Sequence, residues 1–321
     1  MTHHFRSVRA LLRAPDRQTR EIVSAALADQ GCRCVVTADH RGEAEHYLRA
    51  DMVDLLICDA GRDPDEACDA VRRMRNSPGG DNAFALSVIL TERPNPGQTM
   101  RLIDSGTDAI LVKPFPPAAL AERLRDLVRG ARQFVVTDDY IGPARCGDDA
   151  GQGADAAPRV EVPNPLRETV LATMSRDELR RAVRTTWEVV AEHRIESQTA
   201  HLVRLVARIR TVFASRPPAA EAAVLLAEVL GCASELRLRV AGTGFDHVAH
   251  LATTLIEICY GLGHGIDDPD ARWLAALPKV AAGIAIAFSR EREGIQASRR
   301  ISRTIHRKVG SHFPDLIAAH P

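Results

Sequence analysis

Short runs of apolar residues alternate with longer segments of helical period along the first part of the chain. The apolar runs are too short for helices and are typical of strands buried in a parallel sheet. The predicted strands are Val8–Arg13, Cys32–Thr37, Val53–Cys58, Leu86–Leu90 and Ala109–Val112. The predicted helices are Arg17–Asp29, Gly42–Ala50, Asp65–Arg75, Gly97–Ser105 and Pro117–Gly130. Five such repeats predict an α/β fold with a doubly wound parallel sheet and helices on both faces.

The pattern changes in the second half of the chain, where every long segment has helical period. Ser175 and Glu178 form a capping box that predicts a helix start, and this helix should continue to about Ser215. Three more helices are predicted over Ala219–Val240, Phe245–Leu262 and Pro269–Val309. Short loops between amphipathic helices predict an all-α helical bundle. The first and last helices exceed the middle pair in length, so their ends could pair with a second copy as a homodimer.

Residues 142–165 differ in composition from both neighbours. They contain four Gly, four Pro and five Ala but no Leu, Ile or Phe. Such a segment buries too little apolar surface to offset the entropy lost on ordering. The sequence therefore predicts three parts: a first domain over residues 1–140, a flexible linker over 141–165, and a helical domain over 166–321.

Overall charge and cysteine content limit the partners and the cellular compartment to be expected for this chain. Lys and Arg together number 42, as do Asp and Glu, so the whole chain has no electrostatic bias towards nucleic acid or acidic membranes. Seven scattered cysteines are typical of reduced thiols in a cytoplasmic protein, and Cys32 and Cys34 are interpreted as packing residues on one strand. No N-terminal apolar run predicts a signal peptide, and no segment is expected to span a membrane.

Three polar side chains end consecutive predicted strands. Asp59 follows LLIC, Thr91 follows VIL, and Lys113 follows AILV. The carboxyl ends of parallel strands meet at one edge of the sheet, where open α/β folds place their chemistry. A carboxylate, a hydroxyl and an ammonium at that edge suit phosphoryl transfer to the carboxylate. Asp59 would attack, Thr91 would hydrogen-bond the phosphoryl oxygen, and Lys113 would offset its charge.

With these residues in place, residues 8–130 resemble the receiver domain of bacterial two-component response regulators. The resemblance rests on Asp59, Thr91, Lys113-Pro114-Phe115 and the segment GTDAILVKPF, and it covers about two-fifths of the chain. It implies a flavodoxin-like fold, a phosphoacceptor role for Asp59, a conformational switch hydroxyl at Thr91 and the family's lysine loop at Lys113.

The chain departs from the family where Mg²⁺ normally binds. Ala14 and Pro15 stand at the two usual acidic positions, and only Asp16 remains. Mg²⁺ commonly uses one or two carboxylates with several waters, so Asp16 and Asp59 supply the minimum set. Binding of Mg²⁺ is therefore expected to be weak or absent. Ile110 also replaces the aromatic residue that commonly precedes the lysine by three positions, so the usual coupling between that ring and Thr91 is expected to be altered.

Two interpretations of Asp59 remain open. In one, Asp59 is phosphorylated weakly or with unusual metal dependence. In the other, the domain is a pseudo-receiver whose surface serves only for docking. The missing acids favour the second interpretation, whereas retention of Asp59 with Thr91 and Lys113 supports the first.

Histidines in the helical half are candidates for a phosphotransfer site. They are His193, His201, His247 and His250. His250 is followed by Leu-Ala-Thr-Thr, which lacks the Lys and Gly of the phosphotransfer pattern, and His193-Arg-Ile-Glu does not match the kinase-type motif. His247 and His250, with Asp246, could also contact a metal, although no third ligand lies at a fixed spacing. Ordinary core or surface histidines are the favoured interpretation.

The predicted last helix ends in a basic segment, residues 290–308, with seven Arg or Lys against two Glu. This net charge of +5 could meet nucleic acid, acidic lipid or an acidic partner. It also suits a solvated face at a helix C-terminus. No helix-turn-helix pattern accompanies it, so nucleic acid is not expected as a partner.

Together these features predict an atypical response regulator in a phosphorelay: a signal transduction phosphoprotein that acts by binding and not as an enzyme. The expected partners are a histidine kinase or phosphotransfer protein, and a protein that binds the helical bundle. The alternatives are phosphoryl exchange between Asp59 and a bundle histidine, and a DNA-binding regulator that uses the basic segment.

Overall fold

The computed structural model describes residues 5–61, 63–77, 81–145, 158–214, 220–241 and 245–310, without the side chains of 41, 246, 290–292 and 294–310. It divides into two compact units, Met1–His193 and Arg194–Pro321. The boundary differs from the predicted one at 165, because the helices after 165 begin in the first unit. Leu166 packs into an apolar core on one face of the parallel sheet. Leu179 and Val183 pack into a separate core of the same unit, together with Phe134.

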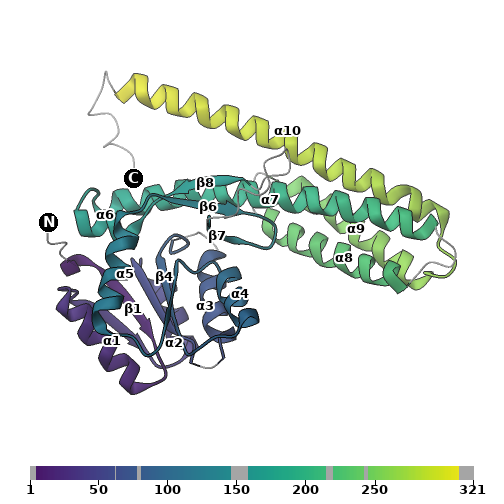
Figure 1. Ribbon diagram of the computed structural model, residues 1–321. Helices are drawn as coiled ribbons and strands as arrows, with labels where there is room; N and C mark the ends of the chain where they lie inside the picture. Colours follow the sequence, from purple (N-terminus) through teal and green to yellow (C-terminus); the bar gives the residue numbers. More distant parts are fainter. Residues whose placement is uncertain are drawn as a thin grey trace. The chain divides into compact units, whose positions relative to one another are not determined.

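The first unit contains the predicted five-stranded parallel sheet, in the order β2-β1-β3-β4-β5 (Figure 1). Its strands are β1 Arg9–Arg13, β2 Cys34–Ala38, β3 Leu55–Asp59, β4 Leu86–Thr91 and β5 Ala109–Val112. The central strands β3 and β4 are buried along their whole length, as their apolar runs predict. β2 begins two residues later than predicted, so buried Cys32 precedes the strand and exposed Cys34 starts it.

Helices cover both faces of this sheet, as the resemblance implies (Figure 1). They are α1 Arg17–Asp29, α2 Arg41–Ala50, α3 Asp65–Arg75, α4 Pro96–Asp104 and α5 Pro117–Arg129, after a short 3-10 helix at Phe5–Ser7. α1 and α5 pack on one face of the sheet, and α2, α3 and α4 pack on the other. The two apolar cores hold the strands in register, so the strand ends, and the side chains on them, are fixed.

A second, antiparallel sheet overturns part of the linker prediction. It pairs β6 Arg132–Val136 with β7 Ile141–Pro143 on one side and β8 Arg159–Val162 on the other. Val160 and Val162 of β8 alternate with polar residues and pack with Phe134 of β6. Ile141 of β7 belongs to the same core, so both ends of the predicted linker are ordered. Residues 146–157, the middle of the predicted linker, lie outside the described residues.

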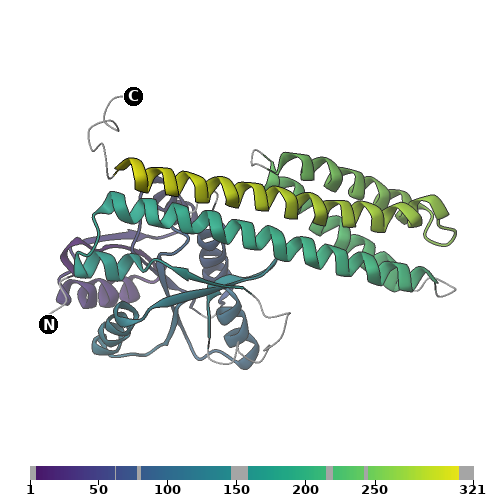
Figure 2. The same cartoon turned by 90° about the horizontal axis from the view of Figure 1, so that it is seen from above.

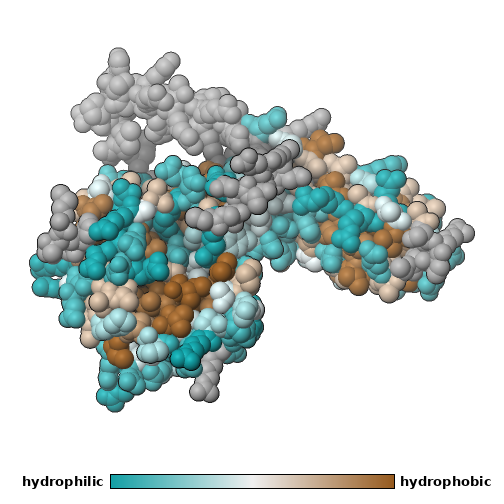
Figure 3. Space-filling model, viewed as in Figure 1, coloured by the Kyte–Doolittle hydropathy of each residue, from teal (hydrophilic) through white to brown (hydrophobic). Residues whose placement is uncertain are grey.

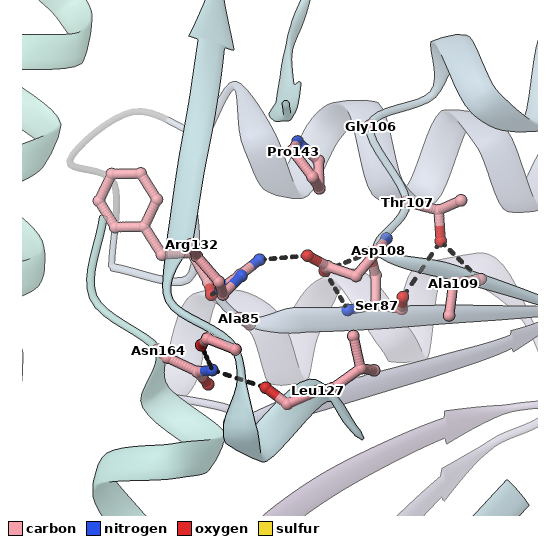
Figure 4. Close-up of polar contacts among 12 residues, drawn as sticks. Ala85, Ser87, Gly106, Thr107, Asp108, Ala109, Leu127, Arg132, Pro143 and Asn164 are labelled. Carbon is pink, nitrogen blue, oxygen red and sulfur yellow. Dashed lines mark hydrogen bonds and ion pairs between the residues drawn. The ribbon is translucent and has the colours of Figure 1, made fainter. Parts of the chain in front are cut away.

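Buried ion pairs fix the second sheet to the amino-terminal edge of the parallel sheet. Asp108, directly before β5, accepts hydrogen bonds from Arg132 of β6 and from the backbone and hydroxyl of Ser87 (Figure 4). It also accepts a hydrogen bond from Arg75 of α3. Both guanidinium groups also lie over the Phe134 ring, 5.0 Å from its centroid. Burial lowers the pKa of Arg75 to about 10, so its charge persists at neutral pH.

A similar arrangement lies before β3. The fully buried Asp54 accepts hydrogen bonds from the Arg9 amide, from Thr169 of α6 (Pro165–Leu171) and from Arg176, the first residue of α7 (Arg176–Ala214). These contacts explain why α6 and the start of α7 belong to the first unit.

The second unit is helical, as predicted. The later part of α7 shares one apolar core with α8 Ala220–Val240, α9 Asp246–His264 and α10 Ala271–Gly310 (Figure 2). Leu202, Leu205 and Ile209 of the predicted α7 stripe are buried in this core. Gln198 of α7 adds a polar contact, donating to the Cys232 carbonyl and accepting from Arg239.

One segment of α10 differs from the expectation that nothing could span a membrane. Ala271–Ser289 is 19 residues long, with a mean hydropathy of 1.4, so by length and composition alone it could cross a membrane. A core helix meets the same criteria, and this segment contributes Leu277, Ala281 and Ile284 to the helical core, although only 22% of it is buried. Composition alone therefore does not place it in a membrane.

Candidate functional site

Asp59 and Lys113 meet at the carboxyl edge of the parallel sheet, as predicted. Asp59 ends β3, and its side chain is almost fully buried. Its Oδ1 accepts from Lys113 Nζ at 2.8 Å and from the Gly61 amide at 3.1 Å. No described residue donates to Oδ2, so one oxygen of this buried carboxylate remains available for chemistry. Lys113 follows β5 directly and precedes Pro114 through a cis peptide bond.

Thr91 lies on the neighbouring strand, but its hydroxyl is directed elsewhere. β3 pairs with β4 so that Asp59 lies beside Leu90, one residue before Thr91. The Thr91 Oγ1 donates to the Glu92 carbonyl at 3.0 Å, and the side chain is buried. The backbone amide of Lys113 donates to the Thr91 carbonyl at 2.8 Å. Thr91 thus lies on the strand beside Asp59 and next to Lys113, with its hydroxyl donating to the Glu92 carbonyl.

Asp16 serves as the N-cap of α1. Its Oδ2 accepts from both the amide and the hydroxyl of Thr19, each at 2.7 Å. These hydrogen bonds lower the pKa of Asp16, and the charge of Lys113 adds a smaller effect in the same direction. The remaining acid of the expected metal cluster therefore has a local structural role as the N-cap of α1.

The residues present fit a Mg²⁺ site poorly. Mg²⁺ needs near-octahedral oxygen coordination, with one or two carboxylates offered towards it. Asp16 uses Oδ2 for the helix cap and Asp59 uses Oδ1 for the Lys113 ammonium, so each offers one oxygen, and Ala14 and Pro15 offer no side-chain oxygen. Among the described residues, no group of three His, Cys, Asp or Glu could hold a metal ion.

A pocket of about 640 Å³ opens beside Lys113. It lies at the carboxyl ends of the strands, where the order of a doubly wound sheet reverses and ligands commonly bind. Asp59 is not part of its lining, but the Lys113 side chain joins the pocket to that carboxylate. The lining residues are Asp16, Gln18, Thr19, Ile22, Glu92, Arg93, Gln98, Lys113, Pro114 and Phe115.

Comparisons with known proteins agree with this geometry. The virulence transcriptional regulatory protein PhoP of Salmonella choleraesuis is 28% identical over 122 residues, which cover 38% of this chain and 52% of PhoP. The response regulator protein PmrA of Pseudomonas aeruginosa is 29% identical over 178 residues, 53% of this chain and 79% of PmrA. These findings support a response regulator receiver domain over the residues 8–130 that carry the resemblance. The match spans about half the length of PhoP, and no family model matches the chain.

The comparison with solved structures also found response regulators. The chemotaxis response regulator CheY4 of Vibrio cholerae is 26% identical, and the match covers 37% of this chain and 97% of CheY4 with a TM-score of 0.34. A response regulator from Thermotoga maritima is 22% identical, with 37% and 96% covered and a TM-score of 0.33.

Outside the receiver domain, the structure does not assemble the other candidate sites. His247 and His250 of α9 are exposed, while His193 and His201 of α7 are half-buried. No histidine joins a metal-binding group among the residues the structure describes, and the Asp246 side chain lies outside them. The basic side chains of 290–308 also lie outside the described residues, although the helix backbone continues to Gly310.

One buried charge was not predicted by the sequence analysis. Arg13, the last residue of β1, is 2% exposed and lies directly before Ala14-Pro15. A basic residue at the end of a strand is commonly exposed, so the pattern alone gave no reason to expect a buried guanidinium. Only the strand pairing and the contact with α3 reveal it.

Proposed function

We propose that the chain is an atypical response regulator of a two-component phosphorelay, in which the receiver domain controls a protein–protein interaction of the helical unit. It acts in the cytoplasm by binding and not as an enzyme. A histidine kinase or a phosphotransfer protein donates the phosphoryl group to Asp59. The observation that carries the proposal is the Asp59–Lys113 ion pair at the carboxyl edge of the sheet, with Asp59 Oδ2 left open.

The proposed modification needs few groups. Asp59 Oδ2 bonds to the phosphorus of a phosphohistidine, the phosphorus–nitrogen bond breaks, and the imidazole nitrogen keeps the electron pair. Lys113 offsets the added charge, because its ammonium already lies 2.8 Å from the same carboxylate. Thr91 is placed to turn its hydroxyl from the Glu92 carbonyl towards a phosphoryl oxygen.

Exposed apolar side chains on the receiver domain support a docking role. Met100 of α4 and Val112 of β5 are 56% and 44% exposed. Figure 3 shows an apolar area on this face, between α4 and α5. β5 is also the edge strand of the sheet, so its outer backbone groups have no strand partner in that sheet. α7 begins in the first unit and ends in the second, so a change in the receiver domain could reach the helical unit through this one helix.

Hydrogen exchange of the full chain tests the proposal. Treatment with a small acyl phosphate is expected to add one phosphoryl group by intact mass and to change amide exchange in α8, α9 or α10. Asp59→Asn should abolish both effects, whereas Asp126→Asn, at a half-exposed position on α5, should leave both unchanged. Phosphorylation of Asp59 with no change of exchange in these helices would contradict control of the helical unit.

A DNA-binding regulator is the second candidate, because PhoP is named a transcriptional regulatory protein and residues 290–308 are basic. It predicts DNA binding that weakens steeply with salt and is lost on truncation after residue 289. Binding of DNA by the full chain, lost in that truncation, would favour it over the protein-interaction proposal.

A further inference from the structure

The pocket beside Lys113 has the size of a small-molecule site. Its volume of about 640 Å³ lies within the range of pockets that bind small ligands. Three parts of the receiver domain line it: the start of α1, the segment after β4 with the start of α4, and the segment after β5. All of the lining residues belong to the first unit.

One part of this lining is apolar. Ile22 of α1 is 40% exposed, although isoleucine is among the residues most often buried. Pro114 and Phe115, from the segment after β5, line the same pocket, and Phe115 also packs against the apolar core of the sheet. A ligand that covers these three side chains removes apolar surface from water, which favours binding.

Lys113 brings a partly buried positive charge to the same pocket. Its side chain is 21% exposed, and its ammonium donates to Asp59 Oδ1 at 2.8 Å. An ammonium carries three N–H donors, and Lys113 makes no other hydrogen bond to a described residue. Donors of Lys113 thus remain for a bound group, and hydrogen bonds from a cation are strongest to an anion.

Most of the other polar lining groups are engaged or face water. The exposed Asp16 carboxylate caps α1, and the Gln98 side chain belongs to the capping box of α4. Glu92 and Arg93 are exposed and carry opposite charges, which water and salt screen. Lys113 is therefore the lining residue whose charge has the strongest influence on the choice of ligand.

We propose that this pocket binds a small organic anion, in which a carboxylate or phosphate-type group is attached to an apolar body such as a ring. The anionic group contacts the Lys113 ammonium, and the apolar body covers Ile22, Pro114 and Phe115. Such a ligand gives the receiver domain a second input, which does not require a phosphoryl group on Asp59.

A nuclear magnetic resonance titration of the full chain with benzylphosphonate tests the proposal. The phosphorus–carbon bond of this probe cannot transfer a phosphoryl group, so the result does not depend on the proposed function. Methylphosphonate keeps the anion without the ring, and benzyl alcohol keeps the ring without the charge. Benzylphosphonate is expected to bind at least tenfold more tightly than either. Absence of benzylphosphonate binding, or equal affinity for the three probes, would overturn the proposal.

A matched pair of variants locates the apolar contact. Ile22→Ser reduces the apolar lining, and Leu171→Ser on α6 is its control, because both residues are 40% exposed and Leu171 lies outside the lining. Ile22→Ser is expected to weaken benzylphosphonate binding at least threefold, and Leu171→Ser should leave the affinity unchanged. Equal effects of the two changes would place the probe elsewhere and overturn the assignment.

The charge contact has its own variants. Lys113→Met should weaken benzylphosphonate binding at least tenfold, whereas Asp59→Asn should strengthen it at least twofold, because the carboxylate no longer competes for the ammonium. If circular dichroism shows that Lys113→Met does not fold, the double variant with Asp59→Asn replaces it, since both charges of the pair are then removed. Binding that loss of the Lys113 charge leaves unaltered, or that Asp59→Asn does not strengthen, would overturn the role of Lys113 in the pocket.

Discussion

At the amino-terminal edge of the parallel sheet, Asp54 and Asp108 each accept hydrogen bonds on both oxygens, and arginine is a partner of each. At the carboxyl edge, Asp59 is buried to a similar degree, but Lys113 and the Gly61 amide contact only its Oδ1. The three carboxylates differ less in burial than in how many of their lone pairs are used. A saturated carboxylate holds elements together, whereas one with an open oxygen can react.

Asp108→Asn is expected to have the largest effect on stability. The change leaves Arg75 and Arg132 buried without their shared countercharge, so we expect a loss of about 3–5 kcal/mol of unfolding free energy. Denaturant unfolding of the full chain measures it. Asp126→Asn is the control, because its half-exposed pair with Arg129 should contribute about 0.5 kcal/mol or less. Equal losses for the two variants would show that the buried network does not stabilise the fold.

The same carboxylate predicts a pH dependence. Burial alone would raise the pKa of Asp108, but the charges of Arg132 and Arg75 outweigh it and hold that pKa below its usual 3.8. A lowered pKa means that the stabilisation is present above about pH 4 and is lost as the pH falls through the folded-state pKa. Thermal unfolding of Asp108→Asn should therefore depend less on pH below about pH 4 than that of the unaltered chain. Parallel acid profiles would contradict this assignment.

Arg176→Met should have an intermediate effect. Asp54 is fully buried, but it keeps the Arg9 amide and Thr169 as partners, and the Arg176 side chain is partly exposed. We expect a loss of about 1–2 kcal/mol in the same denaturant measurement. A loss as large as that of Asp108→Asn would mean that Arg176 contributes more than its partly exposed position suggests.

Asp59→Asn should have the smallest effect on stability. Lys113 is partly exposed and can extend into water when its partner is neutralised, so we expect a change below about 1 kcal/mol. The variant should nevertheless lose all acyl phosphate labelling. A large destabilisation would place Asp59 with the structural carboxylates and remove the contrast between the two edges of the sheet.

Local sequence patterns predicted much of this fold because they report on local energetics. The α1 and α3 helices match their predicted ranges, and the fully apolar runs located β3 and β4. The second sheet was missed, because RVEV of β8 is a short alternating segment next to residues rich in Gly and Ala. Its strands form only through pairing with β6, a non-local interaction that composition does not report.

The sequence predicted the strand-end residues of the candidate site but not the contacts around them. Asp59 and Lys113 could be placed together because parallel strands end at one edge. The use of Asp16 as a helix cap depends on Thr19, and the burial of Arg13 depends on a contact with Glu66, 53 residues away. The Arg75–Asp108 pair likewise joins residues 33 apart in sequence. Such contacts are set by the packed fold and leave no local pattern.

Mapping of the modified residue tests the central claim most directly. The full chain is treated with a small acyl phosphate, trapped by borohydride reduction, digested, and analysed by peptide mass spectrometry. The account predicts modification at Asp59 and none at Asp54 or Asp108, because only Asp59 keeps an oxygen without a hydrogen bond from the described residues. An unmodified Asp59, or equal modification of the three carboxylates, would contradict it.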